Sequence, residues 1–347
     1  MKVLSESVIS SILKDLSLNE LKAYQQTLVN SLLEFQNDHS IIPPRIVTQT
    51  SAGATHLFMA STGETVGMKA LTGSKAGFKG VTAIVDKYDG YPIGILNAAT
   101  LTAFRTALCS TLGLVKTFPP ESTTGSLGDL ICFGVGDQGL WHVRLALALY
   151  PGKFENVFIV NRSIDKADKI IKDHFNVEFP NVNFQVLPGE DSTSIKNSFV
   201  NVSVAFTCVP STKPTIVKSY IDSNVRDKIY IGAIGSYKPH MIEVDGELTK
   251  EYILKNGGKV IVDSVEHCMD EAGEFLQTGI KAESLIEVAE LFAEKPKPEA
   301  VKQAEYMETN KVVFSKLVGL CIMDMSVGAH VLRESELKGL GVEIDDF

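Results

Sequence analysis

The sequence predicts an α/β protein with a doubly wound parallel sheet in one domain and an α+β arrangement in the other. In the second part of the chain, short apolar segments alternate with helical ones, as in "DLICFGVG", "NVFIVNR", "VSVAFTCV", "KIYIGAIG" and "GKVIVDS". This alternation is typical of parallel strands with helices on both faces. The segment after Pro44 instead reads as short β segments separated by glycines, and Asp89-Gly90 marks a hairpin turn.

The helices of the first part follow from their caps and their apolar spacing. Ser17 and Glu20 form a capping-box pattern, and apolar residues then recur at helical spacing. A second helix is expected over about 100–115, where apolar residues share one face. A last, strongly apolar helix is expected over about 312–333, returning to pack on the first domain.

Breaks in the pattern place the domain boundaries. Residues 116–129 are rich in Pro, Ser, Thr and Gly and read as a linker, and residues 294–300 are another break. We therefore predict a first domain formed by residues 1–120 and 315–347. Residues 121–314 would form the second domain, which holds the parallel sheet.

Composition narrows the class of protein. Among 347 residues, 33 Lys and Arg face 42 Asp and Glu, which gives a net charge of -9. This balance argues against nucleic acid or an anionic membrane as partner, whereas a small anionic ligand needs only local positive charge. Five scattered cysteines without a C-x-x-C pattern predict reduced thiols in a cytoplasmic protein. Neither a signal peptide nor a membrane span is expected, and no histidine pair has metal-ligand spacing.

The segment "FGVGDQG" contains a complete G-x-G-x-x-G motif. Gly134, Gly136 and Gly139 are its glycines, and Asp137 and Gln138 lie between the last two. The motif follows a predicted strand and opens a predicted helix, which is the context of a Rossmann-type dinucleotide site. The helix N-terminus would offer backbone N–H groups to the phosphates. A plain tight turn would explain the glycines but not this context.

The end of the next strand indicates which dinucleotide binds. An acidic residue there holds the ribose of NAD, whereas an arginine accommodates the 2′-phosphate of NADP. Here the strand ends in Asn161, Arg162 and Ser163, without an acid. A guanidinium can hold a phosphate, and the two flanking side chains can donate hydrogen bonds. NADP(H) is therefore the preferred cofactor, with NAD as the alternative if Arg162 is only a solvated surface residue.

Three isolated cations occur in the first domain. Between residues 40 and 72 the charged residues are Arg45, Glu64 and Lys69, and Arg105 is the only charge in the apolar helix over 101–115. A cation in the first turn of a helix opposes the helix dipole, and an unpaired charge beside a buried face is costly. A bound anion would resolve both problems. The pattern predicts a carboxylate-binding pocket, while the alternative is that each cation is simply solvated.

Eight segments resemble the ornithine cyclodeaminase/mu-crystallin family in order and spacing, over nearly the whole chain. They are "PPRI", "GMKAL", "LTAFRTA", "GVGDQG", "NRS", "AIGSYKPHMIEV", "VDSVEHCMDEAGE" and "FSKLVGLCIMDMSVG". The resemblance implies that Arg45, Lys69 and Arg105 bind the substrate carboxylate. It also implies that the first domain, completed by the C-terminal helix, binds substrate and forms a homodimer.

The resemblance implies two further cofactor contacts. Thr207 would lie against the cofactor, and Lys316 falls in the C-terminal "K-S-V-G" region of the family. This chain departs from that pattern, since Leu317 stands where the family has Ser. The departure puts the contact of Lys316 in question.

A second departure concerns the late segment "AIGSYKP". Family members that cyclise ornithine have an aspartate there, which binds the side-chain amine of the substrate. This chain has Tyr237, which is neutral at pH 7 and cannot pair with an ammonium group as a carboxylate does. Ornithine cyclisation is therefore disfavoured.

The resemblance and the residues together predict an NADPH-dependent reductase of a small α-imino acid, such as pyrroline- or piperideine-2-carboxylate. Lys69 would donate a proton to the imine nitrogen, and Tyr237 is a second donor candidate. The alternatives are ornithine cyclodeaminase, an amino-acid dehydrogenase, and a non-enzymatic, crystallin-like protein that binds NADPH.

Other polar residues are expected to be structural. His142, in the helix after the glycine loop, is expected to be a packing or surface residue rather than a catalytic one. The acidic run Asp270–Glu274 could be a carboxylate pair, but a solvated helix end is expected in a chain of this net charge. The same two alternatives stay open for Glu243 and Asp245.

Overall fold

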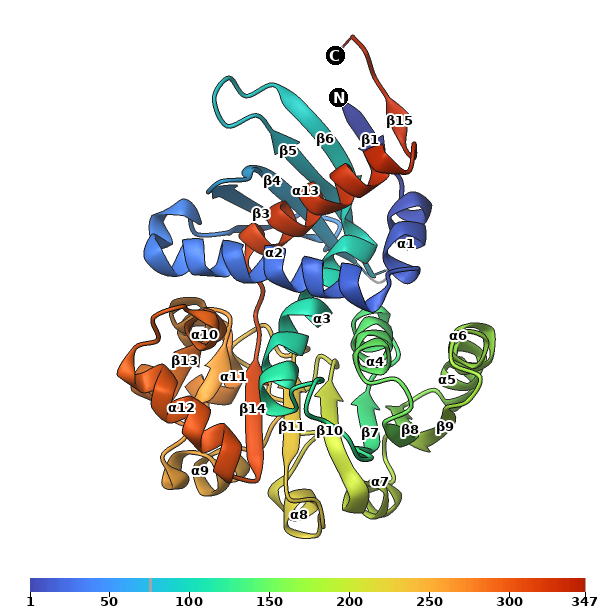
Figure 1. The fold of residues 1–347 in the computed structure, drawn as a ribbon, viewed down its shortest axis with the longest axis vertical. Coiled ribbons are helices and arrows are strands. Elements are labelled where there is room, and N and C mark those ends of the chain that lie inside the picture. The colour runs from blue at the N-terminus through green and yellow to red at the C-terminus, as the bar shows by residue number, and fades with distance from the viewer. Residues whose placement is uncertain (75–76, 347) are drawn as a thin grey trace. The chain divides into compact units, whose positions relative to one another are not determined.

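The computed structural model describes residues 1–74 and 77–346, and its side chains are described except that of Ser74. The chain forms two compact units, each with its own sheet (Figure 1). The first unit comprises Met1–Cys109 and Gly319–Phe347, and the second comprises Ser110–Val318. Helix α3 (Ala98–Thr117) carries the chain from the first unit into the second. It is apolar and long enough to cross a membrane, but it is 83% buried over its most apolar stretch, as a core helix is.

The first unit contains a mixed seven-stranded sheet with the strand order β15-β1-β6-β5-β4-β3-β2. Strands β2 to β6 form an antiparallel meander, and β1 pairs with β6 in parallel. The strands are β1 (Lys2–Leu4), β2 (Ile46–Gln49), β3 (Thr55–Thr62), β4 (Val66–Ser74), β5 (Gly77–Val85), β6 (Pro92–Asn97) and β15 (Val342–Glu343).

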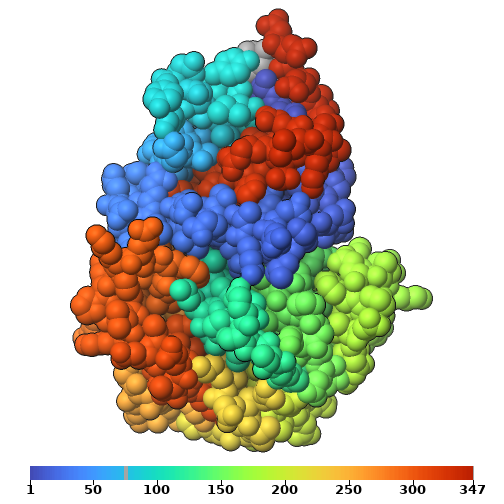
Figure 2. Space-filling view, viewed as in Figure 1, coloured from blue at the N-terminus to red at the C-terminus, as the bar shows by residue number. Residues whose placement is uncertain are grey.

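Three helices complete this unit, namely α1 (Glu6–Lys14), α2 (Leu18–Asn37) and α13 (Cys321–Leu337). Helix α13 lies across β3, β4 and β5, and it packs against α2, which is blue beside the red α13 in Figure 2. The predicted capping box is confirmed: Ser17 accepts a hydrogen bond from the Glu20 backbone, and the Glu20 carboxylate accepts one from Ser17. The predicted hairpin joins β5 to β6, with Gly90 at a φ of 77°.

The two faces of this sheet differ. On the face toward α13, one cross-strand row consists of Met59, Lys69, Thr82 and Leu96, all of them buried. The opposite face carries exposed apolar side chains, which are Ile46, Phe58, Met68, Val81 and Ile93. A lysine therefore occupies a core position of the sheet, whereas large apolar side chains lie on its open face.

The second unit contains an eight-stranded parallel sheet with the order β13-β12-β14-β11-β10-β7-β8-β9, which confirms the predicted α/β class. The strands are β7 (Gly128–Phe133), β8 (Phe154–Asn161), β9 (Asn183–Pro188), β10 (Val202–Thr207), β11 (Ile229–Ala233), β12 (Val260–Val262), β13 (Leu285–Glu287) and β14 (Val312–Lys316). The strand order reverses between β7 and β10, and ligands of such sheets bind at this switch point.

The helices of the second unit connect these strands. They are α4 (Asp137–Leu149), α5 (Ile164–Ile170), α6 (Asn176–Glu178), α7 (Ser192–Ser198), α8 (Lys218–Asp222), α9 (Gly246–Tyr252), α10 (Val265–Glu271), α11 (Gly273–Leu276) and α12 (Pro298–Thr309). Strand β7 and helix α4 are therefore consecutive, as the glycine motif predicts.

One predicted element is wrong in its first half. Residues 312–333 were expected to form one helix, but 312–316 form β14, and α13 starts only at Cys321. Strand β14 lies between β11 and β12 and is buried along its whole length. Gly319, with a φ of 92°, lies in the segment that separates this strand from the helix. A short apolar run can form either a helix or a strand, and here residues 312–316 form a strand that pairs with both β11 and β12.

Candidate functional site

The glycine loop follows β7 and requires its glycines for steric reasons. Gly134 has a φ of 99°, and a Cβ there would lie 2.9 Å from the Val209 side chain. A Cβ on Gly139 would lie 2.2 Å from the carbonyl oxygen of Gly134. Because glycine has no Cβ, the first turn of α4 can pack directly against the end of β7, as in dinucleotide-binding sites.

The N-terminus of α4 fits a phosphate group. Gly136 is its N-cap and has no side chain to bond the backbone N–H groups of the first turn, which begins with Asp137 and Gln138. A Cβ on Gly136 would meet no described atom within 4 Å, so the backbone can be approached closely there. Since the first turn of a helix carries unpaired N–H groups and a partial positive charge, this end of α4 can hold a diphosphate.

The end of β8 places a cation at the neighbouring strand. The Asn161 side chain donates a hydrogen bond to the Ser163 carbonyl over 2.8 Å, and the Ser163 hydroxyl caps α5. Arg162 lies between them and is exposed. Gly189 packs beside this turn, since a Cβ there would lie 3.6 Å from the Arg162 nitrogen. The turn thus presents a guanidinium and no carboxylate at the position that distinguishes NADP from NAD.

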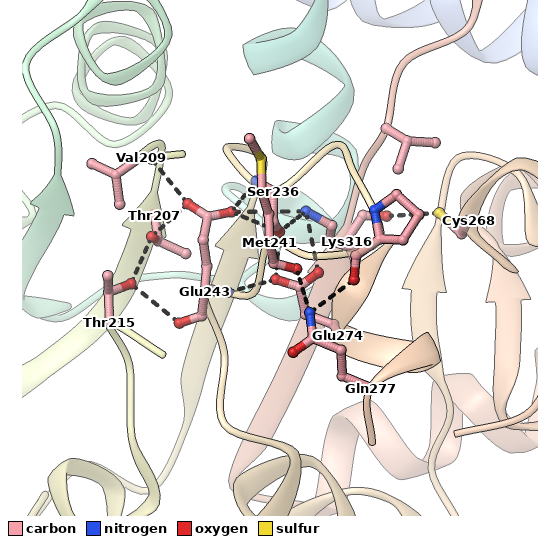
Figure 3. A network of polar contacts seen from close by, with 12 residues as sticks. Thr207, Val209, Thr215, Ser236, Met241, Glu243, Cys268, Glu274, Gln277 and Lys316 are labelled. Atoms are coloured by element: carbon pink, nitrogen blue, oxygen red, sulfur yellow. Dashed lines mark hydrogen bonds and ion pairs between the residues drawn. The ribbon is translucent and has the colours of Figure 1, made fainter. Parts of the chain in front are cut away.

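A buried polar network lies beyond the ends of β10 and β11 (Figure 3). The Glu243 carboxylate accepts hydrogen bonds from the Thr207 hydroxyl at 2.7 Å, the Val209 backbone at 2.9 Å and the Ser236 backbone at 2.8 Å. Glu243 therefore ties together the loops that follow these two strands. Burial raises the pKa of Glu243, while Lys316 acts in the opposite direction.

Lys316 supplies the positive charge of this network. Its Nζ donates a hydrogen bond to the Ser236 hydroxyl over 2.6 Å and lies 3.7 Å from Glu243 Oε2 and 3.6 Å from Glu274 Oε2. Glu274 also accepts a hydrogen bond from the Glu243 backbone at 2.7 Å. We call Thr207, Ser236, Glu243, Glu274 and Lys316 the acid–lysine network.

The structure corrects one sequence expectation and decides a second. The sequence favours a solvated helix end for Glu274 and leaves Glu243 open between such a position and a carboxylate pair, but the two are 2% and 0% exposed. Their burial is tolerated because Lys316 forms an ion pair with each of the two carboxylates. The expected cofactor contacts of Thr207 and Lys316 stay predictions, and the structure gives both side chains internal partners.

Tyr237 follows the network directly. It lies in the loop after β11, next to Ser236, and is half-buried, which raises its pKa. The Lys238 ammonium lies 5.6 Å from the centre of its ring. The loop is thus fixed by Glu243 at Ser236, and Tyr237 presents a neutral phenol at this position.

The first unit brings Lys69 and Arg105 to one carboxylate. Lys69 Nζ on β4 donates a hydrogen bond to Asp324 Oδ1 over 2.8 Å, and Arg105 Nε on α3 donates to the same oxygen over 3.2 Å. Lys69 and Asp324 are 1% and 0% exposed, and Arg105 is 5% exposed. The two cations therefore share one buried anion on α13.

Arg45 joins the same group from the segment before β2. Its Nη2 donates a hydrogen bond to the Gly319 carbonyl over 3.0 Å. A Cβ on Gly319 would lie 2.9 Å from both terminal nitrogens of Arg105, so the two arginines lie against one glycine. We call Arg45, Lys69, Arg105 and Asp324 the cation cluster. It carries three positive charges and one negative charge.

Lys69 has the ionisation behaviour of a proton donor near neutral pH. Its pKa is lowered to about 8, mainly by burial and also by Arg105, while Asp324 acts in the opposite direction. A lysine with an ordinary pKa near 10.4 would hold its proton too tightly for transfer at pH 7.

Comparison with known proteins shows which proteins this chain is similar to. No family model matches the chain. An uncharacterised Saccharomyces cerevisiae protein, YGL159W, is 29% identical over 93% of this chain and 96% of its own length. A Bacillus cereus Delta(1)-pyrroline-2-carboxylate reductase is 25% identical over 96% and 97%. The ketimine reductase mu-crystallin of Macropus fuliginosus is 25% identical over 73% and 68%. The chain is thus similar, over most of its length, to members of the ornithine cyclodeaminase/mu-crystallin family.

Solved structures show that the whole chain has the fold of this family. The Thermococcus litoralis Delta(1)-pyrroline-2-carboxylate reductase, in complex with NADH and L-proline, matches 99% of the chain with a TM-score of 0.75 at 15% identity and is covered to 100%. An archaeal alanine dehydrogenase dimer with bound NAD matches 100% with a TM-score of 0.75 at 15% identity and is covered to 99%. A probable ornithine cyclodeaminase from Bordetella pertussis matches 99% of this chain and 100% of its own, with a TM-score of 0.73 at 21% identity.

Sequence reasoning missed the acidic member of the cation cluster. Asp324 is the only charged residue from 317 to 332, as Arg105 is from 101 to 115. The reasoning that singled out Arg105 would therefore have found Asp324 as well. The structure places the three predicted cations together and adds a carboxylate between two of them.

Proposed function

We propose that the protein is an NAD(P)H-dependent reductase of a small α-imino acid, with pyrroline-2-carboxylate or piperideine-2-carboxylate as leading substrates. The observation that carries this proposal is the excess positive charge of the cation cluster. Lys69 and Arg105 are buried and share a single carboxylate, and Arg45 adds a third charge beside them. Since buried excess charge is costly, an anionic ligand such as a substrate carboxylate would stabilise the cluster.

The cofactor residues are those of the glycine loop and the end of β8. The first turn of α4 and Gly136 would hold the diphosphate, and Arg162 would hold the 2′-phosphate of NADP. When bound, the reduced nicotinamide supplies a hydride. The absence of an acid at Asn161–Ser163 supports a preference for NADPH over NADH.

The other steps belong to this chain's own side chains. Arg45 and Arg105 would hold the substrate carboxylate, which fixes the orientation of the imine. Lys69, whose pKa burial lowers to about 8, would donate a proton to the imine nitrogen. Tyr237 offers no negative charge to a side-chain ammonium, so the site favours a substrate without one over ornithine.

We also propose that the protein is a cytoplasmic homodimer. The open face of the first unit's sheet, with Ile46, Phe58, Met68, Val81 and Ile93, is the apolar surface that a second copy would cover. None of the five cysteines, all of which lie in the described part of the chain, forms a disulfide, which suits a reducing compartment. A dimer that dissociates on Met68→Asp substitution, as measured by light scattering, would support this surface.

The activity is tested by the loss of NADPH absorbance with each cyclic ketimine. Lys69→Ala should lower kcat by about 100-fold or more, as removal of a general acid does, while the NADPH dissociation constant stays unchanged. Arg162→Ala should weaken the binding of NADPH and leave the binding of NADH unchanged. Absence of turnover with every α-imino acid would overturn the proposal. Ammonia release from ornithine would identify a cyclodeaminase instead, and NADPH binding without any turnover would identify a crystallin-like binding protein.

A further inference from the structure

The carboxylate of Asp324 is buried and bonds to two members of the cation cluster. Its Oδ1 accepts from both Lys69 and Arg105, whereas its Oδ2, although buried, has no hydrogen-bond partner among the described residues. By contrast, both oxygens of the buried Glu243 accept backbone hydrogen bonds and tie loops together. The contacts of Asp324 Oδ1 are thus with two cations, Lys69 and Arg105.

We propose that Asp324 is the positioning residue of the cation cluster, whose carboxylate keeps Lys69 charged and directed as the proton donor of the reductase. This inference rests on the function proposed above. It assigns to Asp324 a role in the reaction that acts through Lys69, without contact with the substrate.

The surroundings of Lys69 show why one carboxylate has this influence. Asp324 and the Cys321 thiol face it from α13, and Arg105 faces it from α3. Burial raises the pKa of Cys321 to about 12, so this thiol is neutral at physiological pH. Its neighbours in the sheet row, Met59 and Thr82, carry no charge. Asp324 is therefore the one negative charge among these groups, and it opposes both burial and Arg105.

The proton transfer balances without a further reactant. As the imine carbon accepts the hydride, the C=N π electrons move onto nitrogen, and the nitrogen takes a proton from Lys69 Nζ. An N–H bond breaks on Lys69 and another forms on the product, which leaves a neutral amine. The unchanged Asp324 anion then favours the return of a proton from solvent to Lys69.

The geometry also fixes the direction of the Nζ group. One of its hydrogens is held by Asp324 Oδ1 at 2.8 Å, which leaves the other two hydrogens for other acceptors. Without Asp324, the ammonium would lie next to Arg105 with no compensating charge. The side chain would then lose its proton at lower pH and would lose this orientation.

The test compares Asp324→Asn with the wild type and with the matched control Asp129→Asn. Like Asp324, Asp129 is a buried aspartate, but it bonds to Asn156 and lies at the start of β7 in the second unit. In the wild type, kcat/KM should fall as pH rises through the pKa of Lys69. In Asp324→Asn this decline should begin at a pH lower by at least about one unit, as expected on removal of an opposite charge within hydrogen-bond distance. Asp129→Asn should keep the wild-type profile.

A second measurement reads Lys69 without turnover. The protein is labelled with ε-13C-lysine, saturated with NADP+ and titrated by NMR, and the Lys69 signal is assigned by its loss in Lys69→Arg. The signal should titrate near pH 8 in the wild type and at least about one unit lower in Asp324→Asn. Asp324→Glu, which keeps the charge, should restore the titration toward the wild-type value.

The outcomes separate this inference from the proposed function. If no ketimine is turned over, the proposed function fails, and the NMR titration still tests the effect of Asp324 on Lys69. An unchanged Lys69 titration in Asp324→Asn would overturn the inference even if ketimines are reduced. If Asp324→Asn does not fold, a wild-type Lys69 that titrates below about pH 6 would overturn it, because such a lysine would be neutral despite Asp324.

Discussion

Removal of Lys316 should destabilise the second unit strongly at neutral and alkaline pH. We consider Lys316→Met, which has a similar length and keeps apolar contacts within β14. The substitution leaves Glu243 and Glu274, at 0% and 2% exposure, without their shared cation. At distances of 3.7 and 3.6 Å, the Coulomb attraction to each carboxylate is about 4.5 kcal/mol at an effective dielectric constant of about 20.

Proton uptake limits the loss and makes it depend on pH. In the wild type, burial raises the pKa of Glu243 and Lys316 lowers it, so loss of Lys316 raises that pKa further. Protonating a carboxyl group with an ordinary pKa of 4.5 costs about 1.4 kcal/mol per pH unit, which is about 5 kcal/mol at pH 8 and about 1.4 kcal/mol at pH 5.5. A raised folded-state pKa means that the native state binds more protons, so stability falls as pH rises above 4.5.

We therefore expect Lys316→Met to lose about 3–5 kcal/mol at pH 8, as other broken buried ion pairs do, and about 1–2 kcal/mol at pH 5.5. The assay is urea unfolding followed by far-UV circular dichroism at both pH values. The control is Lys255→Met, whose side chain is 64% exposed and which should change stability by no more than about 0.5 kcal/mol. A loss below 1 kcal/mol at pH 8, or the same loss at both pH values, would refute the reasoning.

Two other predictions concern the second unit. Gly136→Ala should weaken NADPH binding by about tenfold or more in fluorescence titrations without lowering stability, since its Cβ meets no described atom of the chain. Gly139→Ala should lower both NADPH affinity and stability, because its Cβ would lie 2.2 Å from the Gly134 carbonyl oxygen. Equal stability of the two variants would contradict this. Burial lowers the pKa of His142 to about 4, against 6.5 in the unfolded chain, so its contribution is complete above pH 6.5 and is lost as pH falls toward 4. Between pH 7 and pH 5 the wild type should therefore lose about 2 kcal/mol more than His142→Gln in urea unfolding, and equal losses would show that this histidine is protonated in the folded protein.

The parts of the fold that the sequence predicts are those whose causes are local. The capping box of α2 needs two side chains three residues apart, and the hairpin before β6 needs one turn. The glycine loop needs a strand, three glycines and a helix in immediate succession. By contrast, residues 312–316 have an apolar pattern that suits either element. They became β14 because β11 and β12 flank that position.

The candidate site divides in the same way. The sequence alone indicated Arg45, Lys69 and Arg105, because isolated cations in apolar segments need partners that their neighbours do not provide. It could not show that they lie together, since Lys69 and its partner Asp324 are 255 residues apart in the chain.

What the sequence by itself determined, then, is the class of the fold, the dinucleotide loop and the residues that require an opposite charge. The tertiary structure alone decided which charges meet. It buried Glu243 and Glu274 around Lys316, and it placed Asp324 between Lys69 and Arg105. The physical reason is that a charge is stable in the interior only beside a partner, and here that partner comes from a distant part of the chain.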